Sequence, residues 1–278
     1  MWRLRTQYTG ALKAAILDWS GTVTDRYVIA PAIVFQEVFK MKGVPITMEE
    51  ARLPMGLRKD LHIQAITEIP EVQERWKDVF GKYPTSNDVN EMFSDFVPKQ
   101  MECLSEYSQI IPGTNEAVSK LRNELQMKIG MTTGFTRPMA DILLKEMKEQ
   151  GFEPDVNVTG DEDEHGARPG PFMVYENLDR LGIFPISSVV KVDDTVGGVG
   201  EGLNAGCWTV GLSRYSNYMN INSYEEEAKM TSYEIQLCNN ESRKKLEEAG
   251  AHYVVDSIRE LPEVCAEINE KLRMGIHP

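Results

Sequence analysis

The sequence predicts a doubly wound, Rossmann-like α/β domain with a mainly parallel sheet, into which an all-helical segment is inserted. Three observations support this prediction. Short apolar runs alternate with amphipathic helical patterns over most of the chain. The stretch from residue 24 to residue 111 has almost no strand pattern. The 278 residues are enough for one large or two smaller domains.

Six apolar runs are expected to form buried strands, at residues 12–17, 127–131, 154–158, 189–192, 208–212 and 252–255. Helical patterns separate most of them, at residues 113–126, 137–150, 171–181 and 261–272. In the last pattern, apolar residues form a stripe along one face: Leu261, Val264, Cys265, Ile268 and Leu272. The segment 213–241 is long for a loop between two strands, and we assign no function to it.

The segment without strands is expected to form helices at residues 31–42, 47–52, 57–68, 70–80 and 87–107. Because this block directly follows the first strand, we expect it to be a helical cap. The predicted organisation is a core at residues 1–26, the cap at residues 27–107, and the rest of the core at residues 108–278. Active sites in such sheets lie at the carboxyl ends of the strands, so the cap would cover the site and exclude water.

The composition restricts the partners that we expect. The net charge of −13 argues against nucleic acid, because no basic run offsets it. No stretch has the roughly 18 apolar residues of a membrane helix, and we expect no signal peptide. The four cysteines lie far apart, which is typical of reduced thiols in a cytoplasmic protein. An anionic substrate would need a local positive site, built from a metal ion, a few cationic side chains and helix N-termini.

Asp18 stands directly after the first predicted strand, in the run Asp-Trp-Ser-Gly-Thr at residues 18–22. An aspartate at the carboxyl end of a strand could attack phosphorus, as in the aspartyl-phosphate enzymes. A turn or helix-capping aspartate would show the same local pattern. The motif alone therefore leaves both interpretations open.

Three later motifs favour the catalytic interpretation. After the second strand, Thr133 and Gly134 belong to a turn whose hydroxyl and backbone N–H groups could bind an anion. Arg168 precedes a predicted helix and could hold a phosphoryl oxygen. Asp193 and Asp194 end the fourth strand, where crowded carboxylates are costly unless they bind a cation such as Mg²⁺.

The order Asp18, Thr133, Arg168 and Asp194 resembles the four motifs of the haloacid dehalogenase (HAD) superfamily, over residues 12–256. The resemblance implies that Asp18 attacks phosphorus, and that Asp18, the Ser20 carbonyl and Asp194 hold Mg²⁺. Thr133 and Arg168 would bind the transferring phosphoryl group. Most phosphatases of the superfamily have a second aspartate at the position of Ser20, and serine cannot act as a carboxylic acid.

The predicted cap contains the run Pro-Met-Gly-Leu-Arg-Lys-Asp-Leu-His at residues 54–62, which closely resembles the cap loop of the phosphonoacetaldehyde hydrolases. The resemblance places Lys59 at the Schiff-base lysine of that family and His62 at its acid/base histidine. Met55 and Gly56 match positions that line its site. The resemblance also implies a small phosphonate as substrate and a homodimer that forms through the cap.

The chemistry of a carbon–phosphorus bond explains the need for a lysine. A bare carbanion is a poor leaving group, but an iminium ion formed between Lys59 and the neighbouring aldehyde can accept the electrons of the breaking bond. Lys59 must be deprotonated to attack, so we expect burial or nearby cations to lower its pKa. The expected reaction is the hydrolysis of phosphonoacetaldehyde to acetaldehyde and phosphate, through a Schiff base and an aspartyl-phosphate, as a step of phosphonate catabolism.

Two other functions remain open. The first is another phosphatase or phosphonate hydrolase of the superfamily, and the absence of aspartate at Ser20 together with the presence of Lys59 argues against a phosphomonoesterase. The second is a non-catalytic protein that binds a phosphate ligand, and the presence of all four motif residues argues against it.

Four positions depart from the family that the chain resembles, and the first is Ser20, which stands where alanine is usual. Gly198 stands where an aspartate that supports the metal site is usual, and Asp193 stands where glycine is usual. We hypothesise that Asp193 supports the metal ion instead, while a role in capping the following turn is the alternative. Phe135 stands where tyrosine is frequent, which removes one hydroxyl from the expected site.

Overall fold

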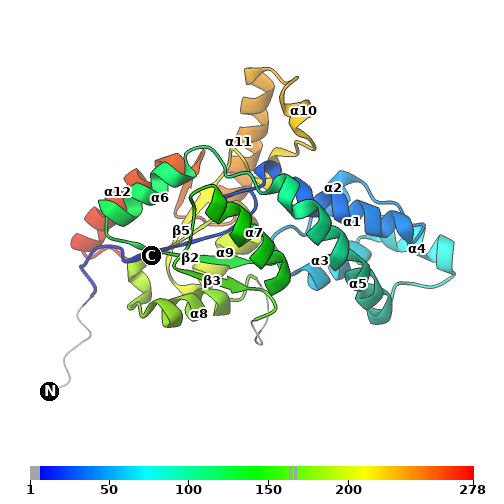
Figure 1. Ribbon diagram of the computed structural model, residues 1–278, viewed down its shortest axis with the longest axis horizontal. Helices are drawn as coiled ribbons and strands as arrows, with labels where there is room; N and C mark the ends of the chain where they lie inside the picture. The colour runs from blue at the N-terminus through cyan, green and yellow to red at the C-terminus, as the bar shows by residue number, and fades with distance from the viewer. Residues whose placement is uncertain (1–6, 163–164, 166–167) are drawn as a thin grey trace.

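The predicted parallel sheet is confirmed in the computed structural model, which describes residues 7–162, 165 and 168–278 (Figure 1). The sheet has the strand order β3-β2-β1-β4-β5-β6, and every pair of neighbouring strands is parallel. The strands are β1 (Ala14–Leu17), β2 (Lys128–Thr133), β3 (Val156–Thr159), β4 (Val189–Asp193), β5 (Trp208–Leu212) and β6 (Tyr253–Val255).

The central strand β1 pairs with β2 on one side and with β4 on the other. Leu17, its last residue, pairs with Met131 of β2 and with Val192 of β4. The residues that follow these three positions therefore emerge next to one another. The strand order also reverses direction here, and such a switch point is the usual place for a ligand in an open α/β sheet.

Helices cover both faces of the sheet, because alternate residues of the buried strands point to opposite sides. Ala15 and Leu17 belong to the larger core, which includes α6 (Thr114–Asn123), α7 (Arg137–Glu149) and α12 (Leu261–Arg273). Ala14 and Ile16 belong to a second core, with α8 (Phe172–Leu181) and the end of α9 (Val196–Ala205). All members of the stripe predicted for residues 261–272 are buried, as expected.

The inserted helical segment is also confirmed, and Figure 1 shows its helices grouped on one side of the sheet domain. It comprises α1 (Ile29–Met41), α2 (Met48–Arg52), α3 (Lys59–Thr67), α4 (Pro70–Phe80), α5 (Ser86–Cys103) and the short η2 (Leu104–Tyr107). The chain leaves the core and returns to it at paired positions: Thr24 forms a bridge with Ile110, and the Ile111 N–H donates to the Val23 carbonyl at 2.8 Å. The boundaries at residues 26/27 and 107/108 remain a prediction.

The structure contains three α-helices that the sequence patterns did not predict. Glycine has a low helix propensity, so the glycine-rich α9 gave no helical signal. The segment 213–241 contains η4 (Asn217–Met219), α10 (Tyr224–Glu227) and the first part of α11 (Ser232–Glu248). Few side chains of α11 are buried, so its apolar stripe is weak. Further 3-10 turns are η1 (Arg26–Val28), η3 (Ile186–Ser188) and η5 (Ile258–Glu260).

Two observations concern the environment of the protein. Among the described residues, no helix combines the length and the apolar character that crossing a membrane requires. The four cysteines are free thiols, as predicted.

Candidate active site

A cavity of about 30 Å³ lies between the cap and the carboxyl edge of the sheet. It is lined by Asp18, Ser20, Val28, Met55, Gly56, Leu57, Lys59, Thr133, Gly134, Phe135, Arg168 and Thr195. All the site residues predicted from the sequence are therefore on its wall, except His62 and Asp194. The cavity brings together residues from three strand ends and from the loop between α2 and α3.

Two glycines permit the cap loop to lie directly on the core. Gly56 has a left-handed backbone (φ +101°), and a Cβ atom there would lie 2.6 Å from Oγ1 of Thr195. A Cβ atom at Gly134 would lie 2.6 Å from the carbonyl oxygen of Leu57. Any larger residue at either position would force the cap loop away from the strand ends. The close contact of Gly56 with the Thr195 side chain and of Gly134 with the Leu57 backbone thus explains both predicted glycines.

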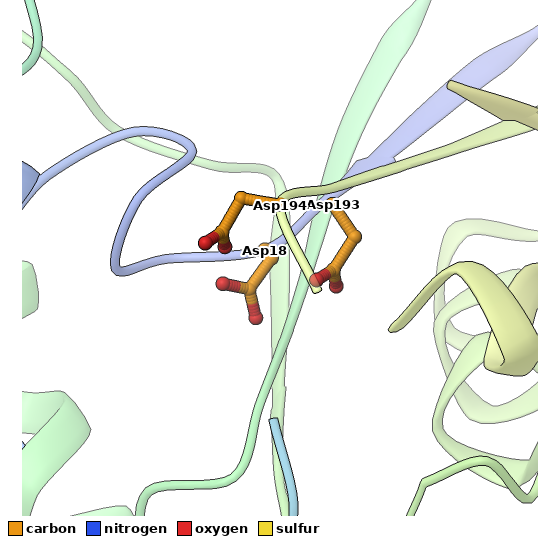
Figure 2. Close-up of side chains that lie close together, drawn as sticks. All are labelled: Asp18, Asp193 and Asp194. Carbon is orange, nitrogen blue, oxygen red and sulfur yellow. The ribbon is translucent and has the colours of Figure 1, made fainter. Parts of the chain in front are cut away.

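Three aspartates gather at the ends of the two central strands. Asp18 follows β1, and Asp193 and Asp194 end or follow β4 (Figure 2). One carboxylate oxygen of each lies within 4.8 Å of the others, a spacing that could hold a metal ion. Asp194 accepts a hydrogen bond from the Asn217 N–H at 2.9 Å through Oδ2, while its buried Oδ1 has no hydrogen-bond partner among the described residues.

The crowding of these carboxylates changes their pKa values. Burial and the charge of Asp193 raise the pKa of Asp18 to about 6, against the opposing effect of Arg168 and Lys191. Burial and the two neighbouring aspartates hold the pKa of Asp194 well above its usual range. Burial acts on Asp193 in the same direction, but the charges of Arg168 and Lys191 outweigh it and lower its pKa.

Arg168 faces the aspartate cluster. Its Nη1 lies 2.7 Å from Oδ1 of Asp18 and 3.4 Å from Oδ2 of Asp193. Its Nε lies 2.9 Å from Oε2 of Glu201, a residue of α9. Lys191 on β4 is a second buried cation. Its Nζ lies 2.9 Å from Oδ2 of Asp193 and 3.1 Å from Oε2 of Glu201.

Lys191 and Glu201 were not predicted as site residues. A lysine inside the apolar run 189–192 was the available signal, because a charge in a buried strand requires a partner of opposite charge. The partner, Glu201, follows in the helix after the same strand, and its position could be recognised only once α9 was known to be helical.

The charges around the cluster do not balance. The three aspartates and Glu201 are four carboxylates, whereas Arg168 and Lys191 are the two cations that contact them among the described residues. With all four carboxylates ionised, two negative charges are in excess, and Oδ1 of Asp194 has no hydrogen-bond partner in the part of the chain that the structure describes. A divalent cation with oxygen ligands would compensate both, so the residues present fit a metal ion of this class.

Asp193 uses its two oxygens differently. Oδ1 accepts hydrogen bonds from the backbone N–H of Thr195 at 3.0 Å and from its hydroxyl at 2.8 Å. Oδ2 faces Lys191 and Arg168. Oδ1 therefore caps the turn, and Oδ2 contacts the two cations of the charged site. The two interpretations of Asp193 each account for one oxygen of its carboxylate.

Lys59 reaches the cavity from the first turn of α3, and its side chain is buried. Its Nζ lies 4.7 Å from the centre of the Phe135 ring and 5.9 Å from that of Phe35. Burial lowers the pKa of Lys59 to about 8, and the charge of Arg168 contributes in the same direction. The predicted lowering is thus present and comes mainly from burial. The Phe135 ring thus lies over the amine. Because phenylalanine has no hydroxyl, this side chain offers the amine no hydrogen-bond acceptor.

His62 lies one turn behind Lys59 and is fully buried, so it does not reach the cavity wall. Its ring stacks on Phe35 with the ring centres 3.9 Å apart, and Nε2 lies 2.9 Å from the carbonyl oxygen of Ala51. A carbonyl only accepts, so Nε2 carries the proton of the neutral ring and Nδ1 is left as an acceptor. Burial and the charge of Lys59 hold the pKa of His62 well below its usual value, which keeps the ring neutral.

Comparison with known proteins agrees with this geometry. Residues 15–212 match the family described as haloacid dehalogenase-like hydrolase. A phosphonoacetaldehyde hydrolase of Bacillus cytotoxicus is 44% identical over 260 residues, which cover 94% of this chain and 97% of the relative. A phosphonoacetaldehyde hydrolase of Syntrophobacter fumaroxidans is 40% identical over 272 residues, which cover 98% and 97% of the two chains.

Solved structures show the same relationship. The crystal structure of a phosphonoacetaldehyde hydrolase like protein from Oleispira antarctica superposes with a TM-score of 0.95 at 34% identity, and each chain is covered completely (100%). A hydrolase from Pseudomonas syringae shares the fold, with a TM-score of 0.68 at 18% identity. The chain belongs to the haloacid dehalogenase-like hydrolases and, among them, to the phosphonoacetaldehyde hydrolase family.

Proposed function

We propose that the protein hydrolyses the carbon–phosphorus bond of phosphonoacetaldehyde to give acetaldehyde and phosphate. The observation that carries the proposal is the position of Lys59. A buried lysine with a pKa of about 8 shares one small cavity with Asp18, although the two residues come from the cap and the core. An ordinary phosphatase would need no amine at the position of Lys59. It would need a carboxylic acid at the position of Ser20, and serine does not supply one.

The first step is proposed to use the neutral amine of Lys59. Its nitrogen attacks the aldehyde carbon, and loss of one water molecule gives an iminium ion. Protons must move between nitrogen and oxygen in this step. We assign these transfers to His62, one helical turn from Lys59, because its Nδ1 carries no proton in the neutral ring and has no hydrogen-bond partner among the described residues.

In the second step, the carboxylate of Asp18 attacks phosphorus. The carbon–phosphorus bond breaks, and its electron pair moves to the iminium nitrogen to form an enamine on Lys59. The phosphoryl group remains on Asp18 as an aspartyl-phosphate. Arg168 and the turn at Thr133 and Gly134 would hold the phosphoryl oxygens during this transfer.

The last steps restore both residues. A water molecule hydrolyses the aspartyl-phosphate and releases phosphate. The enamine takes up a proton at carbon, and the resulting iminium ion is hydrolysed to acetaldehyde and the free amine of Lys59. One water molecule is consumed overall, since the water lost on forming the iminium ion is returned when it is hydrolysed.

We propose Mg²⁺ as the divalent cation, held by Asp18, the Ser20 carbonyl and Asp194. When bound, it supplies positive charge that offsets the phosphoryl oxygens and the clustered carboxylates. The unpartnered oxygen of Asp194 and the excess of buried negative charge support this assignment. The fixed N–H donor of Asn217 would hold the carboxylate of Asp194 in one orientation.

The proposal is tested by assaying the protein with phosphonoacetaldehyde, with and without Mg²⁺, against a panel of phosphomonoesters. We expect turnover of the phosphonate only, and only with the metal ion. Borohydride added with substrate should inactivate the enzyme irreversibly, and mass spectrometry should find the adduct on Lys59. Turnover of phosphomonoesters without any lysine adduct would assign the protein to the phosphatases instead.

We also propose a cytoplasmic homodimer that forms through the cap. The four cysteines are free, two of them buried and two half-buried, which supports a reducing compartment. Exposed apolar side chains on the cap helices support a contact surface there, among them Ile33, Met41, Val79 and Phe80. Light scattering after size-exclusion chromatography would distinguish a dimer from a monomer, and charged substitutions at Val79 and Phe80 should then shift the protein to monomers.

A further inference from the structure

Arg168 is held from behind by a set of buried groups outside the cavity. Its Nη2 donates to the carbonyl oxygen of Thr132 at 3.0 Å and to the Thr132 hydroxyl at 2.7 Å. Its Nε donates to Glu201 at 2.9 Å. A guanidinium has five N–H donors, and these contacts use both donors of Nη2 and the one of Nε. Only Nη1 is left to face Asp18 and Asp193.

The hydroxyl of Thr132 is shared between two cations. It accepts from Arg168 and also from Nζ of Lys191 at 2.7 Å, and it donates to Oε2 of Glu201 at 3.1 Å. Its two lone pairs and its proton are therefore all used. Thr132 is fully buried (0% exposed) and does not line the cavity, unlike its neighbour Thr133.

The shared Thr132 hydroxyl offsets the repulsion between Arg168 and Lys191. Two buried cations repel each other, and each tends to turn toward the carboxylates of the cluster. Lys191 is held by Thr132, Asp193 and Glu201, which matches the three donors of an ammonium group. The Thr132 oxygen between the two cations thus helps to hold Lys191 and fixes the rotation of the Arg168 guanidinium.

We propose that Thr132 is a positioning residue for the phosphoryl-binding Arg168: its hydroxyl fixes the guanidinium so that a single nitrogen, Nη1, is presented to the phosphoryl group beside Asp18. The inference rests on the proposed function, in which Arg168 binds the phosphoryl oxygens. Without the hydroxyl, Nη2 and Lys191 each lose an acceptor in a buried environment, and the guanidinium gains freedom to rotate.

The experiment compares Thr132→Val with Thr132→Ser in the full-length, Mg²⁺-loaded protein. Valine keeps the branched shape and removes the hydroxyl, while serine keeps the hydroxyl. Binding of inorganic phosphate is measured by isothermal titration calorimetry, independently of turnover. We expect the dissociation constant to rise about 10-fold or more in the valine variant, as for the loss of a hydrogen bond to a charged group. The serine variant should bind nearly as the wild type does.

Thr209→Val is the matched control. Thr209 is a fully buried threonine on β5 whose hydroxyl bonds to His252, and no hydrogen bond joins it to Arg168 among the described residues. Its substitution should lower the melting temperature without changing phosphate binding. If Thr132→Val is insoluble, Thr132→Ala replaces it in the same comparison.

A second measurement separates positioning from a loss of stability. If Thr132 acts through Arg168, the effects of Thr132→Val and Arg168→Lys on phosphate binding should not add in the double variant. Additive effects, or a valine variant that binds phosphate like the wild type, would overturn the inference and leave the proposed function standing. Failure of the wild-type protein itself to bind phosphate would instead overturn the phosphoryl-binding role of Arg168, and with it the proposed function.

Discussion

A Cβ atom at Gly198 would lie 1.8 Å from Oδ2 of Asp193. The carboxylate that extends from the end of β4 thus fills the space into which any side chain at position 198, on α9, would project. This relationship supports the hypothesis that Asp193 supplies from the strand the negative charge that the family resemblance leads us to expect at position 198. It also explains why position 198 is glycine when position 193 is aspartate.

The first prediction follows from this shared space. Asp193→Gly should raise the Mg²⁺ concentration needed for half-maximal activity by about 10- to 100-fold, as is typical when support behind a metal ligand is lost. Gly198→Asp alone should fold poorly, because its side chain would collide with Asp193. The double variant should recover both the fold and the affinity for Mg²⁺. Calorimetric titration of Mg²⁺ provides the measurement without substrate.

Thr195→Val is the control for this exchange, because it changes the turn that Asp193 caps. Thr195→Val removes the hydroxyl that donates to Oδ1 of Asp193 but leaves Oδ2 and its cations in place. If Asp193 merely caps the turn, Asp193→Gly should reduce stability and leave the Mg²⁺ dependence unchanged.

Asp18→Asn should abolish turnover and leave the fold intact. Asparagine has nearly the same shape, but it lacks the negative charge for attack on phosphorus and for binding of a cation. Asp18 is buried at 6% exposure with a pKa raised to about 6, so removing its charge should cost little stability. Circular dichroism and single-turnover assays would check this, and a folded variant with near wild-type activity would contradict the role of Asp18.

Lys59→Met should abolish turnover and stabilise the protein. The folded-state pKa of about 8 lies below the ordinary lysine pKa of 10.5, so the folded state disfavours the charged amine. At pH 7 this burial costs up to about 3 kcal/mol of stability, at roughly 1.4 kcal/mol per pKa unit. The gain of the methionine variant should shrink as the pH rises from 8 to 10.5, where the unfolded wild-type chain also loses the proton.

Urea denaturation of both proteins at pH 7 and near pH 10 measures this difference. Ionisable groups that do not interact with Lys59 contribute equally in the two proteins, so their contributions cancel in the comparison. A methionine variant that is less stable than the wild type at pH 7 would contradict the burial of a charged lysine at this position.

The rate of trapping by cyanoborohydride should depend on pH through the amine of Lys59. Only the neutral amine attacks the aldehyde, so the rate of imine formation should rise with pH and level off above a pH of about 8. The measurement is the rate of inactivation in the presence of substrate and cyanoborohydride from pH 6 to pH 9.5. A rate that does not change over this range would exclude Lys59 as the titrating nucleophile.

The position of Asp18 was predictable because one short-range rule decides it. A buried parallel strand ends where its apolar run ends, and the residue at this point stands at the carboxyl edge of the sheet. The same rule applies to Thr133 and to Asp194. Lys59 and His62 lie on a cap helix, and the periodicity of that helix does not show that it covers the sheet. They were assigned through the run at residues 54–62, which resembles a known family.

The tertiary structure alone decided which groups support these residues. Thr132, Lys191 and Glu201 come from two strands and from a glycine-rich helix with no helical signal of its own. Their hydroxyl, ammonium and carboxylate meet only because neighbouring strands are in register and α9 packs against β4 and β5. Local sequence determines where a strand ends and which side chain stands there, whereas the partner of a buried charge is set by contacts between segments that are distant in the chain.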